Sequence, residues 1–505
     1  MAYNRKSNGR HFRRAGASVQ GSLSNWVSAL VDNRVAEMER RKVSNRSWDL
    51  YLNDAMAKGI IEGLVVEAVN TGITPQPHPM IRWIGKDSAW QEDYQQKAYD
   101  LFEIWGLDWR NFCDATGRCN IYMLQALAFF QWKLEGIGLF QVVMQNDPGR
   151  PLGLSVLPID PGRLVTPYDL PASRDVYDGL ELDKNGAVKA AYITKPDKQY
   201  ANYAASSDDC IRIKAQNAQT GFPNLFTVCD VRNVAEYRQD SIMGSMIKEI
   251  KDSNDFVDAA LIKALIQNLW TAFVTSDMGA NAANNTGTSS TSWEDRIQEL
   301  EKGTLIFGRE GEEANFLDSN SPGPSYEIMN RSIVSRLGMA TGRGAENVSR
   351  SYNASYSASR ANIENATRFD DYDRMILTNR FCQPVFSMMQ YEAALRGILP
   401  VSSIDHFKNN LYAYTRTDWM PPPNRPIDHQ KEAKADSERL GNNTRTYSDI
   451  YGRQGQNWRV ALRQKAIEKA YMKELEQEFD ITLDVQSITS VEPEGEVEGN
   501  EEDNN

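Results

Sequence analysis

Motifs for catalysis and metal binding are scarce in this 505-residue sequence. Its four histidines are far apart, and none stands at a spacing typical of metal ligands. The five cysteines include no C-x-x-C pair, and an odd number in a long chain argues against a disulfide framework. No G-x-x-x-x-G-K-[ST] phosphate loop occurs. These absences favour a structural or interaction role, with no enzyme activity, no cofactor and no metal.

Long apolar runs and basic charge are also lacking. No run approaches the roughly 18 apolar residues of a membrane helix. The basic N-terminus, MAYNRKSNGRHFRR, is not followed by an apolar segment, so we expect no signal peptide and no membrane. The net charge of −12 argues against tight wrapping of DNA by a single subunit, which needs clustered Lys and Arg. Because the cysteines indicate no disulfide framework, we expect assembly in a reducing cytosol.

The two ends of the chain have opposite charge. Residues 1–20 carry five Arg or Lys and no acid, which predicts a flexible basic arm. Seven acids between Glu492 and Asp503 predict a disordered tail. The arm leaves open a second interpretation, a soluble nucleic-acid-binding protein.

The first half of the chain predicts mixed helix and strand. Apolar residues at helical spacing from Ile60 to Val69 indicate a helix, with Gly72 as its cap. Strands are predicted at 137–144, 152–159, 176–182 and 226–234, with a hairpin turn at Asp183–Gly186. Five clustered tryptophans could stack on nucleic-acid bases, but they are better explained as residues of the hydrophobic core. They are Trp83, Trp90, Trp105, Trp109 and Trp132.

A helix is predicted over 244–275, and its second half, AALIKALIQNLWTAFV, is apolar on nearly every side. Such a helix must be covered by protein, and other copies of the chain are the natural cover. A short helix (293–302) and a strand (304–307) should follow. After the break at Ser321–Pro324, a second apolar helix is predicted over 326–340.

The stretch RSYNASYSASRAN, Arg350–Asn362, leads into a long helical pattern that runs from Ser355 to Leu399 and that Pro384 should kink. Three acids near its middle, Asp370, Asp371 and Asp373, could suggest a metal site. We interpret them instead as the solvated face of the helix, because Asp371 and Asp373 cannot share one face. Three smaller helices are predicted at 427–440, 446–451 and 457–478.

The order of these parts resembles the portal proteins of tailed bacteriophages, in particular the family of the lambda portal. The resemblance covers about residues 45–478 and is carried by several phrases, not by one motif. They are WDLYLNDAMAKGIIEGLVVEAVNTGI, LPIDPGRL, KNGAVKAAYI, SIMGSMIKEIKDSNDFVDAALIKALIQNLWTAFVTS, LGMATGRGAENVSRSYNASYSASRAN, WMPPPNRPIDHQKEAKA and TRTYSDIYGRQGQNW. The N-terminal arm departs from the family, and the acidic tail has no counterpart.

The resemblance implies an α+β portal fold with an α/β wing, a helical stem, a small α/β clip, a long channel helix and an α-helical crown. The implied boundaries are a basic arm (1–45), wing (46–243), stem helix (244–276), clip (277–322), second stem helix (323–341), tunnel loop (342–355), channel helix with the rest of the wing (356–425), crown (426–485) and acidic tail (486–505).

The resemblance also implies a homo-oligomeric ring, typically a dodecamer, at one capsid vertex of the virion. Double-stranded DNA would pass through it without sequence specificity during packaging and ejection. The implied partners are the terminase large subunit, head-tail adaptor proteins, the major capsid protein and a scaffold. Twelve copies of a chain with net charge −12 would repel phosphate, as a channel that must not bind DNA requires.

We predict that the tunnel loop lines the bore with a polar surface of low adhesion; its candidate DNA-channel residues are Arg343, Asn347, Arg350, Ser351, Tyr352 and Asn353. The alternative is that these residues only cap and connect two helices. If they line the bore, replacing Arg343 and Arg350 by Ala should leave rings intact and alter packaged DNA. Arg360 is expected to pair with Glu364 on the channel helix.

Overall fold

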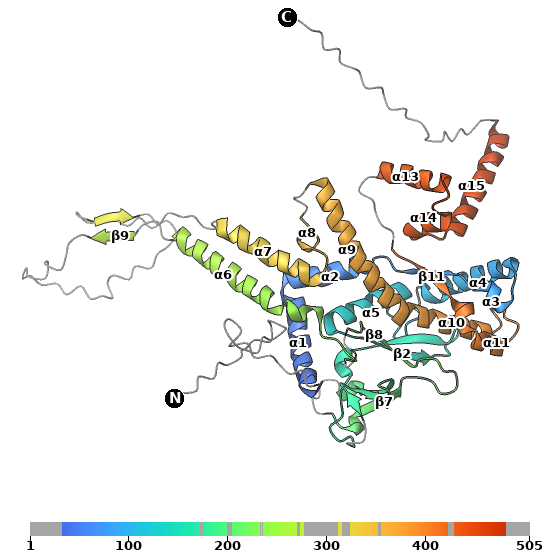
Figure 1. The fold of residues 1–505 in the computed structure, drawn as a ribbon, viewed down its shortest axis with the longest axis horizontal. Helices are drawn as coiled ribbons and strands as arrows, with labels where there is room; N and C mark the ends of the chain where they lie inside the picture. Colours follow the sequence, from blue (N-terminus) through green and yellow to red (C-terminus); the bar gives the residue numbers. More distant parts are fainter. Residues whose placement is uncertain are drawn as a thin grey trace, which may run out of the picture. The chain divides into compact units, whose positions relative to one another are not determined.

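The computed structural model describes residues 33–171, 175–198, 205–232, 234, 236–269, 273–276, 312–315, 324–351, 355–422 and 429–480 (Figure 1). The chain forms two compact units. The first takes in residues up to Gly72 and Pro77–Thr417, and the second combines Ile73–Gln76 with the chain from Asp418 onward. Within the described residues, no helix has the length and apolar character to cross a membrane.

Helices α1 (Asn33–Asn53) and α2 (Ala55–Ala68) are separated by Asp54, whose side chain caps α2 by accepting from the Ala57 amide. Helix α2 ends at Ala68 with Val69 as its C-cap, so the prediction that Gly72 caps it is wrong. Gly72 instead has φ +113° in the following turn, where a Cβ would lie 2.1 Å from the Tyr122 ring. The close approach of this ring, together with the positive φ, requires glycine.

Helices α3 (Ile81–Ile84), α4 (Ser88–Gly106) and α5 (Ile121–Glu135) follow. The prediction that the clustered tryptophans fill a core is right for Trp105 and Trp132, which are buried. It is wrong for Trp83 and Trp109, which are 72% and 85% exposed. Composition alone could not separate these cases, because tryptophan also occurs at surfaces.

Two antiparallel sheets of the first unit pack together. One has the order β3-β2-β8, from β2 (Gly138–Met144), β3 (Leu154–Ile159) and β8 (Leu225–Val228). The other has the order β4-β5-β6-β7, from β4 (Val176–Tyr177), β5 (Leu180–Leu182), β6 (Val188–Thr194) and β7 (Cys210–Lys214). The hairpin predicted around Asp183–Gly186 is β5–β6. A shared apolar cluster that includes Leu139, Leu180 and Ile193 packs the two sheets together.

Among the described residues of this region, 3₁₀ turns occur at Pro161–Arg163, Pro196–Lys198, Ser207–Asp209 and, before the next helix, Ile242–Ser245.

Helices α6 (Ile247–Leu269) and α7 (Pro324–Thr341) run side by side (Figure 1). Phe256 stacks on Tyr326 with ring centroids 5.5 Å apart, and Arg336 pairs with Glu249 at 2.5 Å. Beyond α6, β9 (Phe273–Ser276) pairs antiparallel with β10 (Glu312–Asn315). The helix predicted over 244–275 is therefore wrong at its end, because residues 273–275 belong to β9. The helix and strand predicted at 293–302 and 304–307 lie outside the described residues.

Helix α8 (Ala345–Ser349) precedes α9 (Tyr356–Leu377), a π-helical turn (Thr378–Cys382) and α10 (Gln383–Leu395) (Figure 1). The π turn stands directly before Pro384, in the first turn of α10, where a missing N–H is tolerated. The sequence predicts a kink at Pro384; the structure has a π-helical turn immediately before Gln383 and Pro384, and the chain stays helical through it. Helices α11 (Ile404–Asn409) and α12 (Leu411–Thr415) complete the first unit.

The second unit contains the pair β1 (Thr74–Pro77) and β11 (Thr417–Met420), with α13 (His429–Gly441), α14 (Tyr447–Arg453) and α15 (Trp458–Phe479). The three small helices predicted here are confirmed to within a few residues. Thr446 and Asp449 form a capping box, which explains why α14 begins where it does.

Candidate functional site

The turn Thr341–Gly344, between α7 and α8, sets the geometry of the candidate site. Gly342 and Gly344 have φ of +75° and +82°, a backbone region that favours glycine. A Cβ on Gly342 would lie 2.5 Å from the Phe369 ring. Because both flanking residues adopt these conformations, the chain turns sharply and the Arg343 side chain enters the protein.

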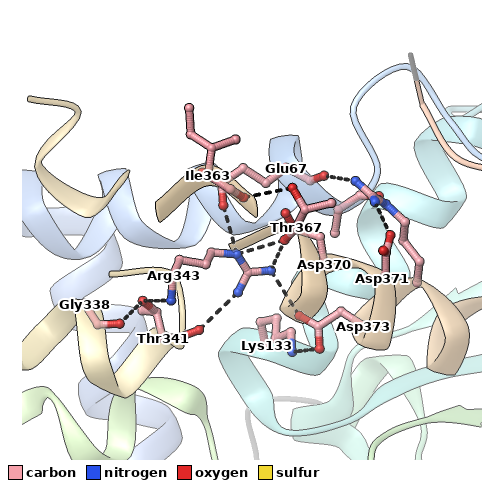
Figure 2. A network of polar contacts seen from close by, with 12 residues as sticks. Glu67, Lys133, Gly338, Thr341, Arg343, Ile363, Thr367, Asp370, Asp371 and Asp373 are labelled. Carbon is pink, nitrogen blue, oxygen red and sulfur yellow. Dashed lines mark hydrogen bonds and ion pairs between the residues drawn. The ribbon is translucent and has the colours of Figure 1, made fainter. Parts of the chain in front are cut away.

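Arg343 lies at the centre of a buried charge cluster formed with Glu67, Lys133, Asp370 and Asp373 (Figure 2). Its Nε lies 2.9 Å from Asp370 Oδ1 and 2.8 Å from Glu67 Oε2, and its Nη2 lies 3.1 Å from Asp373 Oδ2. Nη1 donates to the Thr341 carbonyl at 3.2 Å. The cluster therefore joins the turn to α2, α5 and α9.

Lys133 of α5 is the second cation of the charge cluster. Its Nζ donates to Asp373 Oδ1 at 2.8 Å and lies 3.9 Å from the centre of the Trp132 ring. Burial lowers the pKa of Lys133, against the raising effect of Asp373. The ion pair with Asp373 is thus what makes a lysine tolerable at this depth.

Three carboxylates face two cations in the charge cluster. Burial raises the pKa of Asp370 and of Glu67, while the Arg343 guanidinium acts in the opposite direction on both. The exposed fractions of the two side chains differ, 8% for Asp370 and 34% for Glu67. Glu67 is therefore the surplus acid that lies nearest to solvent.

The interpretation of the acids on α9 as a solvated face is wrong for two of the three. Asp370 and Asp373 are each 6% exposed and, three positions apart, share the face that packs against the protein. Asp371 is exposed and pairs with Arg374 at 2.9 Å. The prediction that Asp371 and Asp373 lie on different faces of the helix is confirmed. The prediction of a solvated face fails because Asp370 and Asp373, three positions apart, share the packed face.

Arg343 itself is 5% exposed, so it is not an available cation in this subunit. The prediction that an Arg343 substitution would spare assembly rested on a free side chain, and the observed burial contradicts that premise. A buried guanidinium with three carboxylate partners contributes to folding, whatever else it does.

The other predicted channel residues are distributed along a short helix and its end. Asn347 is half-buried on α8, a helix that sequence reasoning did not expect inside the loop. Arg350 and Ser351 are exposed, and Arg350 ends α8 with φ +52°, a left-handed conformation that costs a non-glycine residue roughly 1–2 kcal/mol. Tyr352 and Asn353 lie outside the described residues.

Two further contacts fix the surroundings of α8. Asn362 Nδ2 donates to Glu346 Oε2 at 2.9 Å, which links α9 to α8. The predicted pair of Arg360 and Glu364 is confirmed, with Nε to Oε1 at 3.3 Å.

A shallow pocket of about 20 Å³ lies between α2 and the segment 341–350. Gly59, Gly63 and Glu67, one turn apart on α2, form one wall, and Asn347 and Arg350 are on the other. Its size allows little more than a water molecule. Within the described residues, no group of three or more His, Cys, Asp or Glu could hold a metal ion.

Glu67 and Lys133 are the functional candidates that sequence reasoning missed. Neither belongs to a local motif, and they stand 276 and 210 positions before Arg343 in the chain. Only the contacts in Figure 2 bring them together. A lysine within the apolar α5 sequence was the one available signal, because such a residue requires a partner.

Solved structures of a gene transfer agent particle resemble the chain at low identity. One is the virion of the native particle, with 12% identity, coverage of 74% of this chain and 93% of that chain, and a TM-score of 0.37. Another is the neck of the native particle computed with C12 symmetry, with 12% identity, coverage of 83% of this chain and 92% of that chain, and a TM-score of 0.40. The neck of the empty particle computed with C6 symmetry gives 13% identity, coverage of 84% and 95%, and a TM-score of 0.43.

The family model described as phage portal protein, lambda family, matches residues 20–373. This match spans more than half of the chain and includes α1–α8, most of α9 and the charge cluster. The chain belongs to the lambda family of phage portal proteins.

Proposed function

We propose that this portal protein forms a ring of twelve identical subunits at one capsid vertex, through which double-stranded DNA enters during packaging and leaves during ejection. The observation that carries the ring is the α6–α7 pair. Leu261 and Ile262 on α6 are each 57% exposed, and Ile328 and Met329 on α7 are 70% and 48% exposed. Two helices with apolar side chains facing outward need further protein to cover them.

Neighbouring copies supply that cover in a ring. A contact between two different faces of the same helix pair repeats around a rotation axis and closes without leaving an exposed end. Copies of the same chain can then cover the apolar side chains of both helices, and no other protein is required for this. The sequence pattern of residues 244–275 predicts self-assembly. We keep this prediction and propose that the exposed apolar residues of α6 and α7 make the contacts between subunits.

The family organisation gives the parts of the subunit their proposed roles. Residues 46–243 and 356–425 form the wing and channel helix, α6 and α7 belong to the stem, 277–322 to the clip, 342–355 to the tunnel loop and 426–485 to the crown. The proposed partners are the terminase large subunit and head-tail adaptor proteins at the clip, with the major capsid protein and a scaffold around the wing. The protein works as a virion component without catalysis or cofactor.

DNA would pass the loop without being held. Net charge is −12 per subunit, so the assembled ring repels phosphate. Arg350 and Ser351, both exposed, are the described loop residues that we propose touch the backbone. Contacts of this kind are sensitive to salt and independent of sequence.

The experiment is electron microscopy of the purified full-length protein with sedimentation mass analysis. Closed rings with a mass that is a multiple of the 57.1-kDa subunit are expected. A monomer that binds DNA would favour the nucleic-acid-binding alternative, and deletion of residues 1–20 would then abolish the binding. ATP turnover by protein free of motor subunits would overturn the non-catalytic role.

A further inference from the structure

Helix α15 is held only loosely by its own subunit. It is 22 residues long and is described over its whole length, yet none of its residues is buried. In the second unit it packs against α14, where Lys465 Nζ lies 5.4 Å from the centre of the Tyr451 ring. A helix in a protein gains most of its stability by burying an apolar face. The remaining faces of α15 are therefore available to further protein.

Exposed apolar side chains line one of those faces. They follow one another at intervals of seven, four and eight positions, which keeps side chains on the same side of a helix. We call them the apolar stripe of α15. They are Val460 (46% exposed), Ile467 (55%), Tyr471 (60%) and Phe479 (61%).

The charges that border the apolar stripe change sign along the helix. Arg463 lies between the first two residues of the stripe, three and four positions from them, and is exposed. Glu474 and Glu478 lie three and seven positions after Tyr471 and are also exposed. The first half of the stripe is thus bordered by a cation and the second half by two acids.

This order of charges is the reverse of what the helix itself favours. Acids stabilise the first turn of a helix and bases the last turn, because of the helix dipole. Helix α15 has no acid in its first turn and no base in its last, and its first turn contains Arg459 while its last contains Glu478. The isolated helix gains nothing from this distribution, which points to charges outside the subunit.

Only a second copy of α15 offers charges that match both halves of the stripe. Residues 1–20 contain no acid, so they cannot pair with the basic half. Residues 481–505 contain no Lys or Arg, so they cannot pair with the acidic half. Two copies of α15 that lie parallel with their ends level would bring Arg463 against Arg463, and like charges in contact oppose association.

We propose that α15 joins neighbouring subunits head to tail. The basic half of its apolar stripe packs against the acidic half of the stripe in the next copy, so that Arg463 faces the partner subunit's Glu474. Each copy then uses one half toward each neighbour, which is a contact that a rotation axis can close into a ring. The inference rests on the ring of the proposed function and adds a contact between subunits apart from α6 and α7.

The test is a charge swap in the full-length protein. Arg463→Glu places an acid opposite the partner subunit's Glu474, and Glu474→Arg places two cations together. Either change should make the exchange of subunits between isotopically labelled and unlabelled assemblies about tenfold faster, as followed by native mass spectrometry. The double variant should return to the unaltered rate. Residues 463 and 474 are roughly 16 Å apart along α15, so such a recovery arises between subunits.

Lys469→Glu is the matched control, because it makes the same change of charge at an exposed position on the opposite side of α15, nine positions from Val460. It should leave the exchange rate unchanged. No acceleration in Arg463→Glu, no recovery in the double variant, or equal acceleration in Lys469→Glu would overturn the proposal. If Arg463→Glu does not fold, as judged by circular dichroism, Arg463→Gln should still accelerate exchange about threefold, and an unchanged rate there would count equally against it.

Two further outcomes concern the partner of the stripe. Deletion of residues 486–505 should leave the exchange rate unchanged, and faster exchange would assign the stripe to the acidic tail and overturn the proposal. A sedimentation mass of two subunits or of two joined rings would indicate pairing about a two-fold axis and contradict the head-to-tail contact.

The same measurements separate this inference from the proposed function. Closed rings in which the charge swap has no effect would overturn the inference alone. Assemblies that are not rings but show acceleration and recovery would overturn the proposed function and keep the contact. A protein that stays monomeric would overturn both.

Discussion

Arg343 and Asp370, 27 positions apart, meet in a buried ion pair in which the Arg343 Nε lies 2.9 Å from Asp370 Oδ1. The pair fastens the turn after α7 to the middle of α9. Asp373 and Glu67 add two more carboxylates to the same guanidinium. The start of the segment 342–355 is therefore fixed by charge in the interior, and its exposed cation, Arg350, lies further along.

Replacement of Arg343 by Met should strongly destabilise the subunit. The change leaves three carboxylates with Lys133 as the cation in direct contact, and loss of one member of a buried ion pair typically costs about 3–5 kcal/mol. The measurement is the free energy of unfolding in denaturant, with Arg360→Met as the control. Arg360 forms an exposed pair with Glu364, so its loss should cost about 0.5 kcal/mol or less. Equal effects of the two substitutions would contradict the importance of the charge cluster.

Stability should depend on the ionisation of Glu135, which is buried at the end of α5 and accepts from Trp48 Nε1 at 3.0 Å. Burial, as the main cause, raises its pKa from 4.5 to about 7. The folded protein thus holds a proton that the unfolded chain has lost between these values, and the free energy of unfolding falls as pH rises through that window.

Glu135→Gln removes this charge and still offers Trp48 an acceptor oxygen. We expect the variant to resemble the unaltered protein near pH 5 and to exceed its unfolding free energy by about 3 kcal/mol at pH 8. Unfolding curves at several pH values provide the measurement. Glu364→Gln, at an exposed position, serves as the control. Parallel pH profiles for Glu135→Gln and the unaltered protein would refute the prediction.

Ile328→Asp should prevent ring formation without unfolding the subunit. Ile328 is 70% exposed on α7, so a charge there costs little in the monomer but would be buried at a subunit interface. Sedimentation mass and circular dichroism together distinguish loss of assembly from loss of folding. Asn330→Asp introduces the same residue at another exposed position of α7 and should assemble normally. Normal ring formation by Ile328→Asp would show that α7 does not contribute to the subunit interface.

Arg350→Ala should leave rings intact and change the amount or retention of packaged DNA. Arg350 is exposed, and its loss removes a cation that can contact phosphate. The measurement is DNA per particle at several salt concentrations, with Arg360→Ala as the control cation on α9. If the variant particles hold full-length genomes as stably as unaltered particles, the proposed contact with DNA is contradicted. Residues 342–355 would then only connect two helices.

The local elements of this protein could be read from its sequence because their causes are local. The β5–β6 hairpin follows from a turn of Asp, Asn and Gly between alternating apolar residues. Helices α13, α14 and α15 follow from periodicity and caps, and Pro384 within the long helical pattern predicts a departure from a regular α-helix near that residue. The resemblance to lambda-type portal proteins, which the family match over residues 20–373 confirms, was equally a property of the sequence.

The candidate site was decided by tertiary structure. Whether Arg343 meets solvent or carboxylates depends on where α2, α5 and α9 pack, and residues from 67 to 373 contribute to one cluster. A carboxylate on a helix is solvated or buried according to the neighbour that its face meets, which is why Asp370 and Asp371, adjacent in sequence, differ so completely. Sequence by itself determined the order of helices and strands and the protein family. Packing alone determined which charges are buried with partners and which are exposed to solvent.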